Sequence, residues 1–258
     1  MSLLKVTNLG KSFGGVKAVD GISFELAAGE LLALIGPNGA GKTTTFNMVN
    51  GQLKADVGSI TLDGQELLGM APRDVWRMGV SRTFQIAETF MSLTVVENVQ
   101  MALLSRDKKL YSLFTRAANY KRDEALGLLD QVSMKPQADR PCSVLAYGDV
   151  KRVELAIAMA NAPKLLLMDE PTAGMAPKER NDLMALTKQL VTERNMAVLF
   201  TEHSMDVVFA FADRMIVLAR GRLIAGGKPL EIRDDPKVQE VYFGTGKTFE
   251  KAFEKATS

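Results

Sequence analysis

The 258-residue sequence is poor in residues that cross-link a chain or bind metals, because Cys142 is its single cysteine and His203 its single histidine. A lone cysteine excludes an intrachain disulfide and a cysteine-rich zinc site, and it fits a reducing compartment. No hydrophobic run approaches the roughly 18–20 residues that cross a bilayer, and residues 1–15 lack the apolar core of a signal peptide. We therefore expect a soluble, cytosolic chain that works at a membrane only by docking on a protein that spans it.

The sequence also lacks a large excess of either charge. Its 32 lysine and arginine residues against 30 aspartate and glutamate residues give a net charge of +2. This balance argues against broad nucleic-acid binding, so we expect no nucleic-acid partner. Hydrophobic residues make up 47% and charged residues 24%, as in ordinary globular proteins, which argues against a disordered or fibrous chain.

Short apolar segments of the strand type alternate with helical patterns along most of the chain. Residues 22–26 alternate apolar and polar side chains, whereas 31–35 form a continuous apolar run typical of a strand covered on both faces. Strands are predicted in addition at 59–62, 165–168, 197–201 and 215–218, and helices at 43–50, 150–160 and 178–191. Because strands that alternate with helices indicate βαβ units, we predict an α/β fold with a mainly parallel sheet and an antiparallel β portion near the N-terminus.

The middle of the chain is helical in pattern and interrupts this core. Thr94 and Glu97 have the spacing of a capping box and open the first helix of the insertion. We assign residues 93–160 to an inserted α-helical subdomain. Residues 1–92 and 161–240 form the α/β core with its antiparallel β subdomain, and 241–258 form a C-terminal tail.

One glycine-rich segment has the spacing of a phosphate-binding loop. Residues 36–43 fit G-x-x-x-x-G-K-[ST] and lie between the apolar strand 31–35 and a helix. The glycines allow several backbone N–H groups to point at one oxyanion, and the helix adds its positive N-terminal end. Lys42 is expected to reach the β- and γ-phosphates and the Thr43 hydroxyl to ligate Mg²⁺. The candidate nucleotide-binding residues are Gly36, Pro37, Asn38, Gly39, Ala40, Gly41, Lys42, Thr43 and Thr44.

A similar segment near the C-terminus serves as a control. Residues 244–248 read Gly-Thr-Gly-Lys-Thr, but the first required glycine would fall at Val241 and no apolar strand leads into the segment. We interpret it as part of a tail with a short helix rather than as a second nucleotide site.

Two further strands end in polar side chains that suit phosphoryl chemistry. The strand that begins at Leu165 ends in Asp169 and Glu170, which could bind Mg²⁺ and polarise an attacking water. The strand 197–201 is followed by Glu202 and His203. Because ligands of open α/β sheets collect at the carboxyl ends of the strands, we expect His203 to contact the γ-phosphate or to hold Glu170 and the water.

In this order, the motifs resemble those of the ATP-binding cassette of ABC transporters, and the resemblance covers nearly the whole chain. It implies one ABC ATPase domain over residues 1–258, with a phosphate-loop NTPase (RecA-like) core that binds ATP and Mg²⁺. Asp169 matches the family's Mg²⁺ aspartate, Glu170 its catalytic glutamate and His203 its switch histidine. Gln85, in Arg-Thr-Phe-Gln, matches the glutamine that connects Mg²⁺ and water to the membrane subunits, and Phe13 matches the aromatic that stacks on adenine.

The family's signature segment corresponds to residues 145–149, Leu-Ala-Tyr-Gly-Asp. The resemblance implies that Ala146, Tyr147 and Gly148 contact ATP held by the opposite subunit of a dimer. Ala146 replaces the family's usual serine, Asp149 its glutamine, and Ala176 the aspartate of the loop after the catalytic glutamate. These departures predict slower turnover or weaker closure and alter the communication between the two ATP sites.

Several details are similar to the cassettes of branched-chain amino acid importers. They are the Leu-Ala-Tyr-Gly signature, the Pro-Thr-Ala-Gly-Met-Ala-Pro-Lys-Glu loop, the insertion at 105–122 and the C-terminal stretch from Glu231. The implied partners are transmembrane permeases, a second cassette (a heterodimer first, a homodimer second) and, indirectly, a periplasmic or extracellular solute-binding protein. The implied location is the cytoplasmic face of the inner membrane, as a peripheral subunit. The alternatives are an exporter cassette of the lipid or lipopolysaccharide type, a non-membrane ABC ATPase, and a regulatory ATP-binding module with weak hydrolysis.

Overall fold

The computed structural model describes residues 2–83, 89–109 and 120–243. The strands are β1 (Ser2–Phe13), β2 (Val16–Ala27), β3 (Leu31–Ile35), β4 (Val57–Leu62), β5 (Gln65–Glu66), β6 (Val80–Thr83), β7 (Leu165–Asp169), β8 (Ala197–Thr201), β9 (Arg214–Ala219) and β10 (Arg222–Gly227). The helices are α1 (Lys42–Val49), α2 (Pro72–Arg77), α3 (Val95–Arg106), α4 (Arg122–Gln131), α5 (Tyr147–Met159), α6 (Pro177–Arg194), α7 (Met205–Phe211), α8 (Pro229–Arg233) and α9 (Pro236–Phe243), with 3-10 turns at Lys135–Gln137 and Cys142–Val144.

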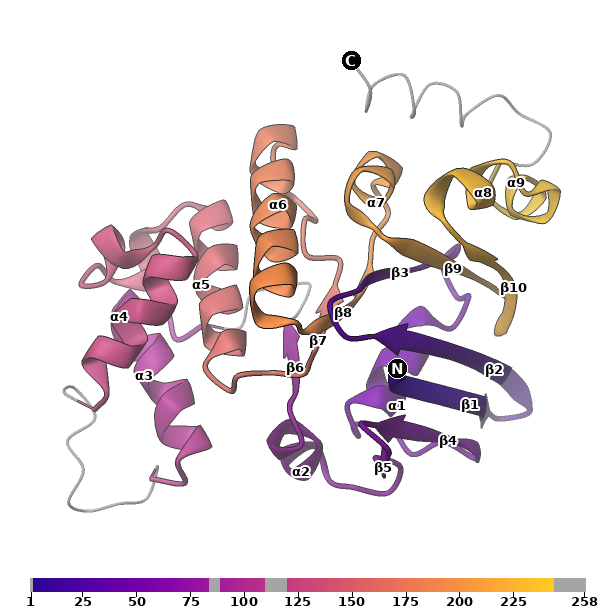
Figure 1. Cartoon of the computed structure of the whole chain (residues 1–258), viewed down its shortest axis with the longest axis horizontal. Helices are drawn as coiled ribbons and strands as arrows, with labels where there is room; N and C mark the ends of the chain where they lie inside the picture. Colours follow the sequence, from indigo (N-terminus) through magenta and orange to yellow (C-terminus); the bar gives the residue numbers. More distant parts are fainter. Residues whose placement is uncertain (1, 84–88, 110–119, 244–258) are drawn as a thin grey trace.

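The described strands form two sheets that lie side by side (Figure 1). The larger sheet has the order β10-β9-β3-β8-β7-β6 and is parallel except for its edge strand β10. The smaller sheet has the order β2-β1-β4-β5 and is antiparallel throughout. This arrangement confirms the α/β class, the mainly parallel core sheet and the antiparallel β portion near the N-terminus.

The strand β3 shows why its sequence is apolar at every position. Leu31, Ala33 and Ile35 face a core formed with the helices, whereas Leu32 and Leu34 face a second core formed with α1 and the smaller sheet. All five side chains are fully buried. A strand covered on both faces has no solvent side and therefore no alternation of apolar and polar residues.

Helices α3, α4 and α5 pack against one another at one end of the molecule, on the left of Figure 1. The predicted capping box is present, since the Thr94 hydroxyl accepts from the Glu97 amide and the Glu97 carboxylate accepts from the Thr94 amide. These helices fall within residues 93–160, and the domain boundaries drawn from the sequence stay a prediction.

Charged side chains join the two ends of the segment between α3 and α4. The Asp107 carboxylate pairs with Arg106 and Lys121 and accepts a hydrogen bond from the Tyr120 hydroxyl, and Glu124 also pairs with Arg106. The hydrogen bonds from Arg106, Lys121 and Tyr120 hold the pKa of Asp107 well below its usual range. These charges therefore hold the end of α3 close to the start of α4.

The helix α5 differs from the sequence-based prediction. A helix was expected from Val150 to Ala160, but α5 begins at Tyr147 and ends at Met159. Ala146 occupies the N-cap position with extended backbone angles and makes no side-chain cap. The start was misplaced because its capping residue carries no side-chain acceptor, which is the signal that sequence reasoning uses.

Candidate active site

The loop between β3 and α1 has the backbone that a phosphate cradle requires. Gly39 and Gly41 have φ angles of 77° and 106°, which side chains other than glycine rarely adopt. A Cβ at Gly41 would lie 2.5 Å from the carbonyl oxygen of Ala18, and one at Gly36 would lie 2.3 Å from that of Leu218. The loop is therefore held between two neighbouring backbones, and its glycines are needed for that fit.

Lys42 folds back over this loop. Its ammonium donates to the carbonyl oxygens of Gly36 at 2.6 Å and Pro37 at 3.2 Å. Burial lowers the pKa of Lys42, while the negative charges of Glu170 and Asp169 oppose that shift. The lysine is thus positioned between the loop and the acidic end of β7.

A cavity of about 310 Å³ joins the loop to residues far away in the sequence. Phe13, at the end of β1, and Glu170 both line it, together with Ala18 and the loop residues 38–44. The Phe13 side chain is half exposed, and the Lys11 ammonium lies 5.7 Å from its ring centre. An open aromatic face beside a phosphate cradle suits stacking of a nucleotide base.

Asp169 and Glu170 lie at the end of β7, beside the end of β8. The Thr201 hydroxyl donates to Asp169 Oδ1 at 2.9 Å, and the Glu170 amide lies 3.1 Å from the same hydroxyl oxygen. Glu170 has a φ of 48°, an uncommon left-handed conformation for this residue type. His203 Nε2 lies 2.9 Å from Glu170 Oε1. The structure therefore brings Glu170 and His203 into contact, which suits one of the two roles expected of His203.

Thr43 and Asp169 are the candidate residues for holding Mg²⁺. A hydroxyl and a carboxylate are hard oxygen donors, and Mg²⁺ at phosphate sites usually takes one or two protein ligands besides phosphate and water. Thr43 lines the cavity, and Asp169 is close enough to Lys42 to act on its pKa. Among the described residues no group of three or more His, Cys, Asp or Glu side chains could hold an ion unaided. The residues present fit an ion that is bound together with phosphates.

The structure does not place every candidate residue at this cavity. Gln85 lies outside the described residues. Ala146, Tyr147 and Gly148 form the N-terminal end of α5 and are not among the residues that line the cavity. The Tyr147 side chain is 43% exposed, so this helix end is accessible to another molecule.

Glu202 is a residue near the site to which the sequence gave no role. Although it is 4% exposed, its Oε1 accepts from the Thr172 amide at 2.9 Å and from the Thr172 hydroxyl at 2.6 Å. Its Oε2 accepts from the His203 amide at 3.1 Å. The carboxylate thus joins the segment after Glu170 to the segment that carries His203. An acidic residue directly after a buried strand was the only signal for it in the sequence.

We expect Glu202→Gln to lower ATP turnover by about tenfold or more, because hydrogen bonds to a charged group are worth roughly 1.5–3 kcal/mol. A glutamine amide nitrogen cannot accept from the amide of Thr172 or of His203. Steady-state phosphate release measures the effect, and the dissociation constant of ATP is expected to stay within about twofold, since this carboxylate does not line the cavity. Thr172→Ser is the control, because it keeps the hydroxyl donor, whereas Thr172→Val removes it. Equal turnover in the glutamine variant and the parent would contradict this role.

Comparisons with known proteins decide the family. The family model for ABC transporters matches residues 19–173. This chain belongs to the ABC transporter family. A second model, for branched-chain amino acid ATP-binding cassette transporters, matches residues 222–248. As a family member the chain is an ATP-binding cassette with a phosphate-loop NTPase core, and it binds and hydrolyses ATP.

The cassette is similar to curated and solved proteins along nearly its whole length. It is 41% identical over 249 residues to the high-affinity branched-chain amino acid transport ATP-binding protein LivG of Salmonella typhimurium, with 94% of this chain and 98% of that protein covered. An ATP-binding cassette solved in its ADP conformation is 31% identical with a TM-score of 0.84, over 95% of this chain and 99% of the other. A dimeric cassette in a post-hydrolysis state with ADP and Pi is 25% identical with a TM-score of 0.73, over 88% and 98% of the two chains.

Proposed function

We propose that this cassette is the ATP-hydrolysing subunit of an importer for branched-chain amino acids or related solutes. The identity to LivG over nearly both full lengths and the family match at residues 222–248 support the choice of solute. The observation that carries the catalytic part is the placement of Glu170 at the cavity of the phosphate loop, with His203 at its carboxylate. These relatives lend no support to the exporter, non-membrane or regulatory alternatives.

In this proposal the chain's own residues bind ATP, orient it and deprotonate the attacking water. The loop amides and Lys42 bind the phosphates of ATP, and Phe13 stacks on adenine. Thr43, Asp169 and Gln85 would hold Mg²⁺, which would neutralise phosphate charge when bound. Glu170 takes the proton of the attacking water, and His203 holds the Glu170 carboxylate in place.

A dimer completes the site in this proposal. Ala146, Tyr147 and Gly148 lie at the N-terminal end of α5 and do not line the chain's own cavity. Ala146 and Tyr147 are exposed there, so this helix end can reach ATP bound by a partner cassette. Helix N-termini favour anions, which suits a γ-phosphate. The dimeric relative with ADP and Pi supports a paired assembly. Two different cassettes are our first choice and a homodimer our second.

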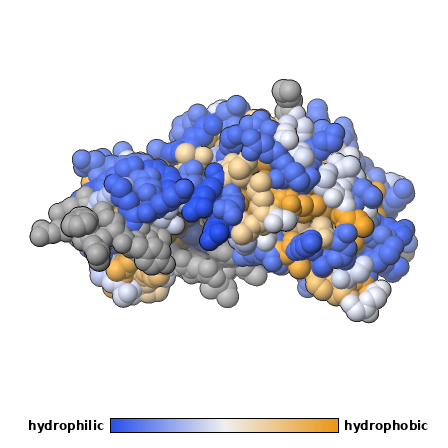
Figure 2. All heavy atoms as spheres, turned by 90° about the horizontal axis from the view of Figure 1, so that it is seen from below, coloured by the Kyte–Doolittle hydropathy of each residue, from blue (hydrophilic) through white to orange (hydrophobic). Residues whose placement is uncertain are grey.

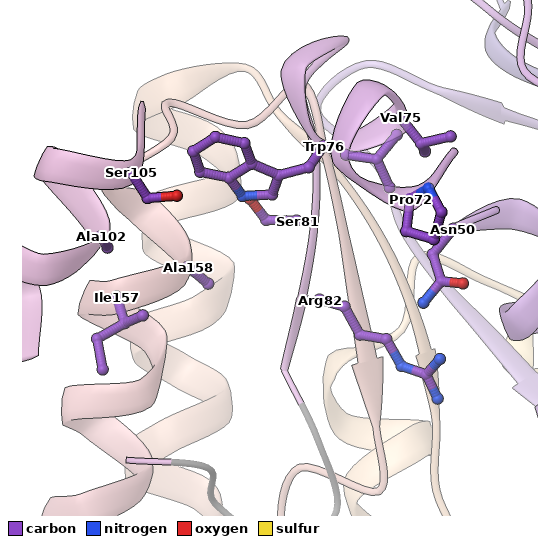
Figure 3. A pocket seen from close by; sticks show the side chains of 11 residues that line it. Asn50, Pro72, Val75, Trp76, Ser81, Arg82, Ala102, Ser105, Ile157 and Ala158 are labelled. Atoms are coloured by element: carbon purple, nitrogen blue, oxygen red, sulfur yellow. The ribbon is translucent and has the colours of Figure 1, made fainter. Parts of the chain in front are cut away.

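The proposed contact with a permease is a cleft of about 340 Å³ between the core sheet and the helices. We call it the lateral cleft; it is lined by Trp76 of α2, Ser81 and Arg82 of β6, Ser105 of α3 and Ile157 of α5, among others (Figure 3). The Ser81 hydroxyl is buried and has no hydrogen-bond partner among the described residues. A cleft with a mixed apolar and polar lining and a buried hydroxyl that can still form a hydrogen bond suits a cytoplasmic helix of a permease.

In the view of Figure 2 the molecule is mainly hydrophilic, and hydrophobic side chains gather in the right half of that face. Within the described residues no helix is long and apolar enough to span a bilayer. We propose a peripheral position at the cytoplasmic face of the inner membrane, with the solute-binding protein contributing from the other side.

Reconstitution tests this function. The cassette is co-expressed with two candidate permeases and a second cassette and placed in liposomes with a solute-binding protein and labelled leucine. We expect ATP-dependent uptake that a Glu170→Gln cassette does not support. The proposal would be contradicted if neither permease copurified with this cassette and if uptake were independent of ATP.

A further inference from the structure

Arg82 connects two parts of the molecule that the sequence treats separately. Its side chain is 9% exposed and projects from β6, so that Nη2 donates to Asp169 Oδ2 at 2.8 Å. Nη1 donates to the side-chain oxygens of Asn47 at 2.7 Å and Gln52 at 3.1 Å. The guanidinium carbon lies 5.8 Å from the ring centre of Phe46. Arg82 thus joins the acidic end of β7 to the helix that begins at the phosphate loop.

The Asp169 carboxylate is therefore engaged at both oxygens. Oδ2 accepts from Arg82, and Oδ1 accepts from the Thr201 hydroxyl. If Asp169 is also a ligand of Mg²⁺, then Arg82 and the ion are two positive charges that bind the same carboxylate. Their repulsion is weakly screened, because the Arg82 and Asp169 side chains are only 9% and 16% exposed. Binding of an ion to this carboxylate therefore weakens the contact of Arg82 with Asp169, and the Arg82 contact weakens binding of the ion.

Arg82 also forms part of the wall of the lateral cleft. Figure 3 shows the indole of Trp76 pointing across the cleft toward the helices that carry Ser105 and Ala158, whereas the Arg82 guanidinium points away from Trp76. In the sheet Arg82 is paired with Leu167 of β7, and Thr83 with Met168. The segment that carries Gln85 follows directly. Arg82 thus belongs both to the contacts of Asp169 and to the wall of the cleft.

We propose that Arg82 is a positioning residue that holds Asp169 in the absence of Mg²⁺, weakens this contact as the metal site fills, and so couples metal loading to the lateral cleft. The inference rests on the proposed function of the cavity as a Mg²⁺–ATP site. In this proposal Arg82 competes with Mg²⁺ for Asp169, and the change in its contacts moves the wall of the lateral cleft, the surface proposed to bind a permease.

The competition is tested by calorimetry with a non-hydrolysable ATP analogue, once with Mg²⁺ and once with EDTA. The dissociation constant in EDTA divided by that in Mg²⁺ measures how much Mg²⁺ strengthens binding of the analogue. We expect this ratio to rise at least about fivefold in Arg82→Gln, the lower end of ordinary coupling between two sites. Arg82→Lys keeps the positive charge and is expected to stay near the parent. Asn47→Ala, which leaves the Arg82–Asp169 pair in place, is the matched control and should leave the ratio unchanged.

The transmission to the cleft is tested with Trp76, the single tryptophan of the chain. Addition of Mg²⁺ to the analogue-bound parent is expected to shift its fluorescence emission, and Arg82→Gln is expected to lose at least half of that shift. An unchanged or smaller affinity ratio in Arg82→Gln overturns the competition, and an unshifted parent emission overturns the coupling. The parent measurement needs no substitution, so it decides even if the glutamine variant does not fold. A parent that binds no analogue would defeat the proposed function instead.

Discussion

Glu170→Gln is expected to lower ATP turnover by about a hundredfold or more while leaving ATP bound. General bases contribute typically 10²–10⁴-fold to rate, and the amide keeps the size of the carboxylate but cannot take a proton. The geometry favours this role, because Glu170 lines the cavity of the phosphate loop and His203 lies 2.9 Å from its carboxylate. Phosphate release under saturating ATP gives the turnover, and calorimetry gives the affinity.

The two readouts separate catalysis from folding. A variant that had lost its structure would lose ATP affinity as well, whereas we expect the dissociation constant to stay within a few-fold of the parent value. The left-handed backbone at Glu170 is already accommodated and is the same for both side chains. Phosphate release at the parent rate would show that another group is the base.

Gly41→Ala is expected to weaken nucleotide binding about a hundredfold. The added Cβ would lie 2.5 Å from the Ala18 carbonyl oxygen at a φ of 106°, so the loop must move. A displaced loop loses backbone hydrogen bonds to charged phosphates, and two such bonds at roughly 1.5 kcal/mol each account for this factor. Titration with a fluorescent nucleotide measures the affinity, and chemical denaturation measures the free energy of unfolding.

Gly64→Ala is the matched control for that experiment. Gly64 also has a positive φ, 78°, but nothing lies within 4 Å of an added Cβ there. Both variants carry backbone strain of about 1–3 kcal/mol in the free energy of unfolding. Only Gly41→Ala is expected to lose nucleotide affinity. If the two variants bound nucleotide equally well, this loop would not be the nucleotide-binding site.

Local patterns were sufficient for the elements whose signals lie within a few residues. The strands 31–35 and 197–201 have the predicted bounds, because a run of apolar side chains needs no distant information to exclude solvent. The capping box at Thr94 was likewise predictable from a short spacing. The helix after the phosphate loop, predicted at 43–50, lies one residue earlier at Lys42–Val49. The strand β10 was missed, since its glycines at 226 and 227 weaken the apolar pattern and its pairing with β9 supplies the order.

The candidate site was predictable in its members but not in all of its connections. Phe13, the phosphate loop and Glu170 were each identified by motif or resemblance, and the structure brings them to one cavity. Gln85 remains a prediction, and the role of Ala146–Gly148 depends on a partner. The links made by Arg82 and Glu202 were not foreseen, because each joins residues 30 or more positions apart.

The sequence by itself determined the phosphate loop, the acidic strand end, the apolar strands and the family, since each is encoded in consecutive residues or fixed spacings. Only the tertiary structure decided that Arg82 binds Asp169 and that the Glu202 carboxylate holds the segment of His203. It also decided that β6 lines a cleft. Those contacts follow from the order β8-β7-β6 in the sheet and from the packing of α1 against it. The spacing of residues along one strand or helix does not specify which other element becomes its neighbour.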